Sequence, residues 1–392
     1  MASNTVVIAG VGMSRFRRPS EGMQFDQLAR EAVGNALSHA GLDARAIQQI
    51  YAGWAFGDTT SGQRAVHGMG LPAVPFFNVN NACASGSSAF YLARQAVMAG
   101  AADCALAFGF EQMPAGAITV HYSDRANVWD KHLEVADARL GEGEGAVALR
   151  VFAAAWREHV ARTGLDAATY ARIAVKARRH AALNPNAVFR QPLTVEKVLA
   201  SSMVIDPITK LQCCPPTSGA AAVLLCSENF ARAHGLNDSV RVAGMGMASE
   251  DPATFDDPID LVGTRVSRRA AEIAYKDASI GPEDLDVVEL HDCFTINELL
   301  SYSALGIVDD DGLAGFVAED QNSFGGRLVV NPSGGLLAKG HPLGATGIAQ
   351  IAELTWQLRG ECEARQVPDA RIALQHNVGL NGAAVVSVLQ KA

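Results

Sequence analysis

"VVIAGVGMSRF" at residues 6–16 has a close match in "VRVAGMGMASE" at residues 240–250. Each stretch is an apolar run that ends in Ala-Gly-x-Gly-Met, the pattern of a strand that leads into a glycine turn. Self-similarity between distant parts of a chain is the sign of an internal repeat. This pair therefore predicts a fold that is built twice.

Two further pairs follow in the same order. Residues 31–53 and 269–292 each have the pattern of an amphipathic helix, a short acidic connection and an apolar strand. Residues 81–100 and 339–360 each begin with small residues and continue as a long helix that ends at glycine. An apolar strand follows each of these helices. Three matched elements in one order predict an α/β fold with two βαβ-type copies.

The domain boundaries follow from where the repeats stop. We predict an N-terminal half over residues 1–118 plus 219–238, and a C-terminal half over residues 239–392. Residues 119–218 carry more charge and interrupt the pattern. An insertion of this size between strands usually forms a lid or a binding loop, and we expect that role for it.

The composition restricts the class of protein. The 392 residues are 49% hydrophobic and 19% charged, which suits a compact α/β enzyme. A net charge of −9 leaves no dominant basic face for nucleic acid. No uninterrupted apolar run reaches the about 18 residues of a membrane-spanning helix. Seven cysteines, an odd number, favour reduced thiols. We expect a cytoplasmic protein without a membrane span.

Equivalent positions of the two copies carry reactive side chains. Cys83 and His341 each stand just before the helix of the third pair. Ligands of such sheets bind at the carboxyl ends of strands and at helix N-termini, so both residues should face one site. A helix N-terminus lowers a thiol pKa, which predicts a reactive Cys83 with His341 as its base. Taken singly, Cys83 could be a small buried thiol, and His341 a helix-start residue bonded to its own backbone.

The stretch "VVELHDCFTINELL" at residues 287–300 places three reactive side chains at positions 291–293, after an apolar strand. They are open to three interpretations: a metal site, part of a nucleophilic triad, or an ordinary strand end. His291 and Cys293 lack two further nearby ligands, and the adjacent cysteines 213–214 lack zinc spacing, so no metal is expected.

Together these motifs resemble the thiolase superfamily. "NNACASG" at residues 80–86 has the pattern of its nucleophilic cysteine, and "GHPLGATG" at residues 340–347 that of its histidine. The sterol carrier protein x type, also called the lipid-transfer-protein type, is resembled by "LQCCPPTSGAAAVLL" (211–225), "HDCF" (291–294) and "QHNVGLNGAAVV" (375–386). The resemblance covers nearly the whole chain. It implies the thiolase fold, in which two βαβαβαββ halves form five α-β-α-β-α layers and a loop domain is inserted.

One departure from ordinary thiolases concerns the second catalytic cysteine. Those enzymes carry it in a Cys-x-Gly motif, where this sequence has His376, and they have alanine where this sequence has Cys293. The resemblance therefore implies that Cys293 takes over the acid/base role. His376 could orient Cys293 or be merely structural.

The implied activity is that of an acyl-CoA:acetyl-CoA C-acyltransferase, which makes or cleaves 3-ketoacyl-CoA through an acyl group on Cys83. His341 and His291 would hold the enolate oxygen. The backbone N–H of Cys83 and one in the Asn377–Gly379 turn would hold the other oxyanion. Asp292 would fix the local loop.

The resemblance also implies ligands and partners. Coenzyme A thioesters would be substrates, with no tightly bound cofactor. "KARRH" at residues 176–180 offers Lys176, Arg178 and Arg179 to the phosphates of such a ligand, or forms a solvated helix face. A homodimer or a dimer of dimers is implied, and the resemblance also allows for a partner protein encoded in a lipid-metabolism operon.

Three other functions remain open. A related condensing enzyme, such as a ketoacyl-synthase, shares the fold and the cysteine but has no use for a second thiol. A steroid side-chain aldolase subunit acting with a partner would lack the nucleophile, whereas Cys83 is present. A lipid-binding or scaffold subunit without catalysis is the alternative from another class.

Overall fold

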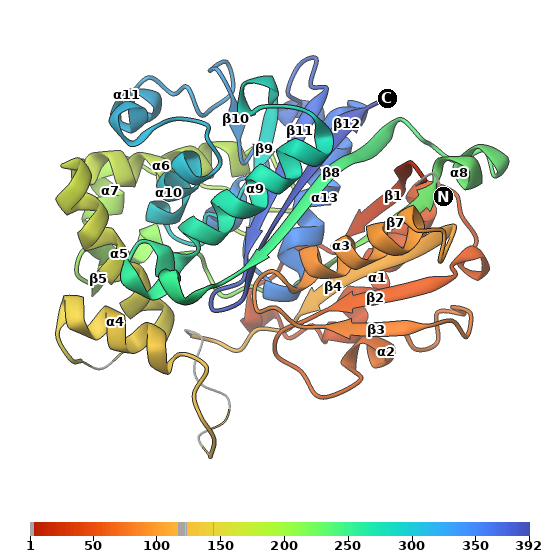
Figure 1. The fold of residues 1–392 in the computed structure, drawn as a ribbon, viewed down its shortest axis with the longest axis horizontal. Coiled ribbons are helices and arrows are strands. Elements are labelled where there is room, and N and C mark those ends of the chain that lie inside the picture. Colours follow the sequence, from red (N-terminus) through yellow and green to blue (C-terminus); the bar gives the residue numbers. More distant parts are fainter. Residues whose placement is uncertain (1–3, 117–121, 123, 144) are drawn as a thin grey trace.

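The apolar runs of the sequence form the strands of one ten-stranded sheet in the computed structural model (Figure 1), which describes residues 4–116, 122, 124–143 and 145–392. The five strands of the N-terminal half are β1 (Val6–Met13), β2 (Gln49–Gly53), β3 (Phe76–Val79), β4 (Cys104–Glu111) and β7 (Gly219–Ser227). The five of the C-terminal half are β8 (Val240–Ser249), β9 (Val287–Glu289), β10 (Val329–Val330), β11 (Ile372–Val378) and β12 (Ala383–Lys391).

The order of the strands shows the duplication. The N-terminal half runs β3-β2-β4-β7-β1 and the C-terminal half runs β10-β9-β11-β12-β8, so each half has the order third, second, fourth, fifth, first. In both halves the last strand is antiparallel to its neighbours. A single pairing of Val7 with Arg241 joins β1 to β8 and makes the two halves one sheet.

Helices cover the halves in layers. The outer face of the N-terminal strands carries α1 (Phe25–Ala40) and α2 (Ser61–Val66). The outer face of the C-terminal strands carries α9 (Thr264–Ala278) and α10 (Thr295–Ala304). Between the two sets of strands lie α3 (Ser85–Met98) and α13 (Leu343–Arg359). The result is the expected α-β-α-β-α arrangement, with one helix from each half in the central layer.

The glycines of the opening motif do not form turns, contrary to the interpretation above. Strand β1 continues through Gly12, and β8 continues through Gly246. A Cβ atom on Gly12 would lie 2.3 Å from the Ala36 nitrogen of α1, and one on Gly246 would lie 2.0 Å from the Ala270 oxygen of α9. The repeated glycines therefore let an outer helix pack directly on each first strand.

The inserted region is helical and lies against the C-terminal half, beside α9, α10 and α11 (Leu313–Ala318) in Figure 1. Its helices are α4 (Asp130–Leu140), α5 (Val147–Thr163), α6 (Ala167–Ala181) and α7 (Val195–Leu199), followed by the hairpin of β5 (Met203–Ile205) and β6 (Ile208–Thr209). The chain then returns to the N-terminal half with β7 and α8 (Glu228–Ala233). The predicted boundary between residues 118 and 119 lies outside the described residues. In the described ranges, no helix combines the length and the apolar character that crossing a membrane requires.

Candidate functional site

Cys83 and His341 meet because the two central helices start side by side. Cys83 precedes α3 and His341 precedes α13. A Cβ atom on Gly86 would lie 2.4 Å from the Gly344 oxygen, so only glycine permits this approach. The internal repeat thus places the predicted nucleophile and base at equivalent helix starts of the two halves, as the sequence indicated.

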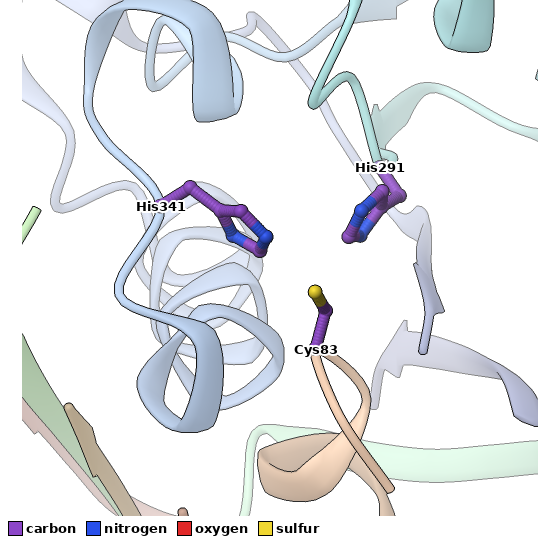
Figure 2. A group of neighbouring side chains, drawn as sticks. All are labelled: Cys83, His291 and His341. Carbon is purple, nitrogen blue, oxygen red and sulfur yellow. The ribbon is translucent and has the colours of Figure 1, made fainter. Parts of the chain in front are cut away.

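A third side chain, His291, completes a trio with them. It follows β9, and both imidazoles point toward the thiol in Figure 2. The Cys83 sulfur and one nitrogen of each histidine all lie within 4.8 Å of one another. The rings of His291 and His341 are perpendicular, with centroids 5.1 Å apart. All three residues are buried.

The Cys83 thiol is protonated in this environment. Burial, helped by the charge of Glu111, raises its pKa to about 12. The expectation that the helix N-terminus lowers the thiol pKa is therefore wrong, because the loss of water outweighs the helix. A thiol of this kind needs a base in contact to become a nucleophile.

Hydrogen bonds fix which nitrogen of His341 can act as that base. The Thr346 hydroxyl donates to the Pro342 oxygen at 2.9 Å, so its oxygen is left to accept from Nδ1–H of His341 at 2.7 Å. The proton of the ring is then on Nδ1, and Nε2 carries a lone pair. Within the described part of the chain this buried Nε2 has no hydrogen-bond partner. Burial lowers the pKa of His341 to about 3, so the ring is neutral.

His291 is held in the opposite tautomer. The Gln375 amide donates to the Ser87 hydroxyl at 3.0 Å, and that hydroxyl donates to the Asn377 oxygen at 3.0 Å. The Asn377 nitrogen then donates to Nδ1 of His291 at 2.8 Å. The proton of His291 is left on Nε2, and burial keeps the pKa of this ring well below its ordinary value. The site thus pairs one acceptor nitrogen with one donor nitrogen.

Cys293 lines the same cavity outside this trio. Its carbonyl oxygen accepts a hydrogen bond from the Cys214 N–H at 2.8 Å. The ring of the next residue, Phe294, stacks on that of Phe152 in α5, with centroids 4.2 Å apart. Burial raises the pKa of the Cys293 thiol well above its ordinary value, so it carries its proton.

His376 lies on the other face of β11 from Gln375 and Asn377, as the alternation of a strand requires. Its Nε2 shares a hydrogen bond of 2.8 Å with the hydroxyl of Ser267 on α9. The hydrogen bond that orients His376 is therefore made to Ser267 of α9 and not to Cys293.

Two other predicted residues hold loops. Asp292 accepts the Leu336 N–H at 2.7 Å and so holds the start of α12 (Gly335–Ala338). The Gly379 N–H is occupied by the Ala383 oxygen at 2.7 Å, while the N–H of Leu380 contacts the Cys83 sulfur. The N–H that this loop directs at the thiol thus lies one residue beyond the predicted Asn377–Gly379 turn.

The trio opens into a cavity of about 1020 Å³ with mainly apolar walls. The cations in its lining are Arg18, Arg125, Arg178 and Lys210. The guanidinium carbons of Arg18 and Arg178 lie 4.9 and 4.6 Å from the centre of the Phe189 ring. The buried thiol and these cations therefore line one mainly apolar cavity.

Only one residue of "KARRH" fits the predicted phosphate contact. Arg178 lines the cavity. Lys176 is buried in an ion pair with Glu298, and Arg179 is paired with Asp320 at 2.8 Å on the surface. The structure places Lys176 and Arg179 outside the lining of the cavity, because neighbouring positions on α6 face in different directions.

The sequence interpretation missed Glu111, at the end of β4. Its carboxylate accepts the backbone N–H groups of Ala55, Phe56 and Gly344 at 3.0 to 3.1 Å, which ties the N-terminal half to the first turn of α13. Burial raises its pKa to about 7. A glutamate after the apolar run "CALAFGF" was the available signal.

Comparisons with known proteins agree with this geometry. The family model described as "Thiolase, N-terminal domain" matches residues 6–229, and "Thiolase C-terminal domain-like" matches residues 248–391. "Sterol carrier protein 2" of Gallus gallus is 45% identical over 98% of this chain and 71% of its own length. "Benzoylsuccinyl-CoA thiolase subunit BbsB" of Thauera aromatica is 36% identical over 95% of this chain and 94% of its own. The solved structure "Ltp2-ChsH2(DUF35) aldolase" superposes with a TM-score of 0.83 at 24% identity, covering 100% of this chain and 99% of that one. The expected fold is confirmed.

Proposed function

The chain belongs to the thiolase family, and from this premise we propose that it is an acyl-CoA:acetyl-CoA C-acyltransferase that makes or cleaves 3-ketoacyl-CoA through an acyl-cysteine. One observation carries the proposal. The Cys83 thiol lies beside a free acceptor nitrogen of His341 and a donor nitrogen of His291, in the lining of a large apolar cavity.

The first step is acyl transfer to Cys83. Nε2 of His341 takes the thiol proton as the sulfur attacks the thioester carbonyl. The leaving coenzyme A thiolate then takes that proton from His341. The N–H groups of Cys83 and Leu380 are the donors proposed for the tetrahedral oxyanion.

The step that makes or breaks the carbon–carbon bond uses Cys293. In thiolysis its protonated thiol supplies the proton that the departing enolate carbon requires, and in synthesis its thiolate removes a proton from acetyl-CoA. The raised pKa of this buried thiol supports the donor role in the resting enzyme. His291, with Nε2–H directed to the trio, is the proposed donor to the enolate oxygen, and in thiolysis His341 joins it while its Nε2 holds the proton taken from Cys83.

The coenzyme A phosphates are proposed to bind at the cations of the cavity lining. Arg18 and Arg178 each contact the Phe189 ring, and Lys210 lines the same cavity. Guanidinium groups bind phosphate oxygens in pairs of hydrogen bonds, which suits this position.

The apolar cavity also favours a second candidate, a lipid-binding subunit that does no chemistry. Relatives named sterol carrier protein 2 and non-specific lipid-transfer protein-like 2 agree with it. This candidate explains the walls of the cavity but gives no role to the unpaired nitrogen of His341 or to the ordered tautomer of His291.

A homodimer is proposed through β3. This strand ends the sheet, and its Phe77 is 46% exposed although it stacks on Tyr51 at 5.0 Å. An unprotected apolar edge strand is a template for pairing with another strand.

Two cysteine variants test the activity. Cys83→Ala should not be acylated when it is mixed with acyl-CoA, as followed by intact-protein mass spectrometry. Cys293→Ala should still form one acyl group per chain but should fail to exchange the α-protons of acetyl-CoA with deuterated water, as followed by nuclear magnetic resonance.

Cys213→Ala is the matched control, because Cys213 lines the same cavity without an assigned role and should keep both reactions. Normal proton exchange in Cys293→Ala would overturn its role. Failure of the wild-type chain to acylate with acyl-CoA of any tested length would favour the lipid-binding candidate.

A further inference from the structure

Three metal-ligating atoms converge at the trio of Figure 2, although no two of them are neighbours in the sequence. The Cys83 sulfur, from the start of α3, and the nitrogens of His291 and His341 lie within 4.8 Å of one another. In a tetrahedral zinc site with Zn–N and Zn–S bonds of about 2.0 to 2.3 Å, ligand atoms are separated by roughly 3.3 to 3.8 Å. A closure of about 1 Å or slightly more would therefore form three of four ligand contacts.

We propose that Cys83, His291 and His341 bind a divalent cation of the zinc class, which blocks the cavity by occupying the nucleophile. Imidazole nitrogen and thiolate sulfur are the ligands that such cations prefer. The fourth position faces the cavity, where water or a small-molecule thiol can complete the coordination.

The surroundings of His341 resemble the outer shell of a metal site. A metal-ligating imidazole usually donates its second N–H to a fixed acceptor. The Thr346 hydroxyl is that acceptor for His341, at 2.7 Å, and leaves Nε2 buried and without a partner in the described chain. This free nitrogen faces the trio and can bind a metal ion without a change of tautomer.

His291 does require a rearrangement. Its Nε2 carries the proton in the hydrogen-bonded chain from Gln375, so Asn377 must turn its amide and accept Nδ1–H instead. The Ser87 hydroxyl then loses its acceptor, which weakens binding by on the order of tenfold. The overall step replaces the S–H bond of Cys83 by a sulfur–metal bond and releases that proton to solvent, with no change of oxidation state.

Titration with Co²⁺ alone tests the site without substrate, so it is independent of the proposed activity. Wild-type protein should bind one equivalent, with a thiolate-to-cobalt charge-transfer band and the intense visible bands of four-coordinate cobalt. Cys83→Ser should lose the charge-transfer band. Cys293→Ser and Cys214→Ser should keep it, because those thiols line the cavity outside the trio.

Asn377→Asp tests the rearrangement that His291 requires. A carboxylate accepts Nδ1–H of His291 in either orientation and should tighten Co²⁺ binding by about tenfold to a hundredfold. As a check that needs no variant, one equivalent of Zn²⁺ should protect wild-type Cys83 from iodoacetamide, and EDTA should restore alkylation. A charge-transfer band that survives Cys83→Ser, unchanged affinity in Asn377→Asp, or unprotected Cys83 would each overturn the proposal.

Discussion

Thr346 determines which nitrogen of His341 can take a proton. Its hydroxyl proton is committed to Pro342, so the oxygen can only accept from Nδ1–H. A valine at this position has nearly the same shape but cannot accept, and the ring is then free to move its proton to Nε2, where it blocks the base. The position of the His341 proton is thus set by a hydroxyl that is hydrogen-bonded to His341 and Pro342.

We predict that Thr346→Val slows acylation of Cys83 by roughly tenfold to a hundredfold, the usual size of such an outer-shell effect. The release of coenzyme A in the first turnover measures this rate. Thr355→Val is the matched control, because Thr355 is buried on the same helix and donates to the Ile351 oxygen at 2.7 Å. Equal rates in the two variants would refute the role of Thr346.

At the scale of an element, residues 176–179 of α6 carry three cations with three different tasks. Lys176 is 2% exposed and paired with Glu298, Arg178 faces the cavity, and Arg179 is paired with Asp320 at the surface. A helix turns by 100° per residue, so neighbouring positions cannot share one face. One helix therefore fastens the inserted region to α10 and also presents a charge to the cavity.

Substituting methionine at each position should separate these tasks. Lys176→Met should lower the free energy of unfolding by about 3 to 5 kcal/mol, because Glu298 is left buried without its partner. Arg178→Met should instead weaken the binding of coenzyme A by about tenfold, the loss of one charge-assisted contact. Urea unfolding and isothermal titration calorimetry give the two quantities. Arg179→Met should change neither by much, and a large loss of affinity there would restore the original prediction for it.

At the scale of the whole molecule, buried neutral histidines make the fold sensitive to acid. Burial lowers the pKa of His159 to about 4 and that of His180 to about 3. The unfolded chain takes up a proton near the ordinary value of about 6.5, whereas the folded chain does not. The stability due to these groups is thus present above that pH and is lost as the pH falls from about 6.5 toward 3.

His180→Gln tests this dependence, since both ring nitrogens of His180 are hydrogen-bonded inside the protein. Between about pH 7 and about pH 5 the wild-type free energy of unfolding should fall by about 2 kcal/mol more than that of the variant. Urea unfolding at the two pH values measures the difference. An identical fall in both proteins would contradict the assignment.

The association of whole molecules can be tested at β3. Phe77→Lys places a charge on the proposed pairing edge, which natural proteins use to prevent such contacts. The variant should sediment as a monomer where the wild-type chain sediments as a dimer. Ile273→Lys is the control, because Ile273 is exposed to a similar degree, 43%, on α9. A variant at Phe77 that stays dimeric would exclude this edge.

The repeats predicted the two halves, the order of elements and the meeting of Cys83 with His341, because equivalent helix starts converge in a duplicated fold. Spacing could not predict the trio, since its members come from three segments that only the folded chain brings together. It also misplaced Lys176, because the burial of one face of α6 depends on α10. The glycines of β1 predicted a turn, because a glycine that makes room for a helix packed on the strand looks the same in the sequence as a glycine in a turn.

Because the two halves share the site, its residues are synthesised at different times. The nucleophile belongs to the half that leaves the ribosome first, and its base arrives later, with α13. Until then the thiol of Cys83 has no neighbouring imidazole to remove its proton. Nascent chains would therefore carry an inert cysteine, and they would become able to react with thioesters only once both halves have docked.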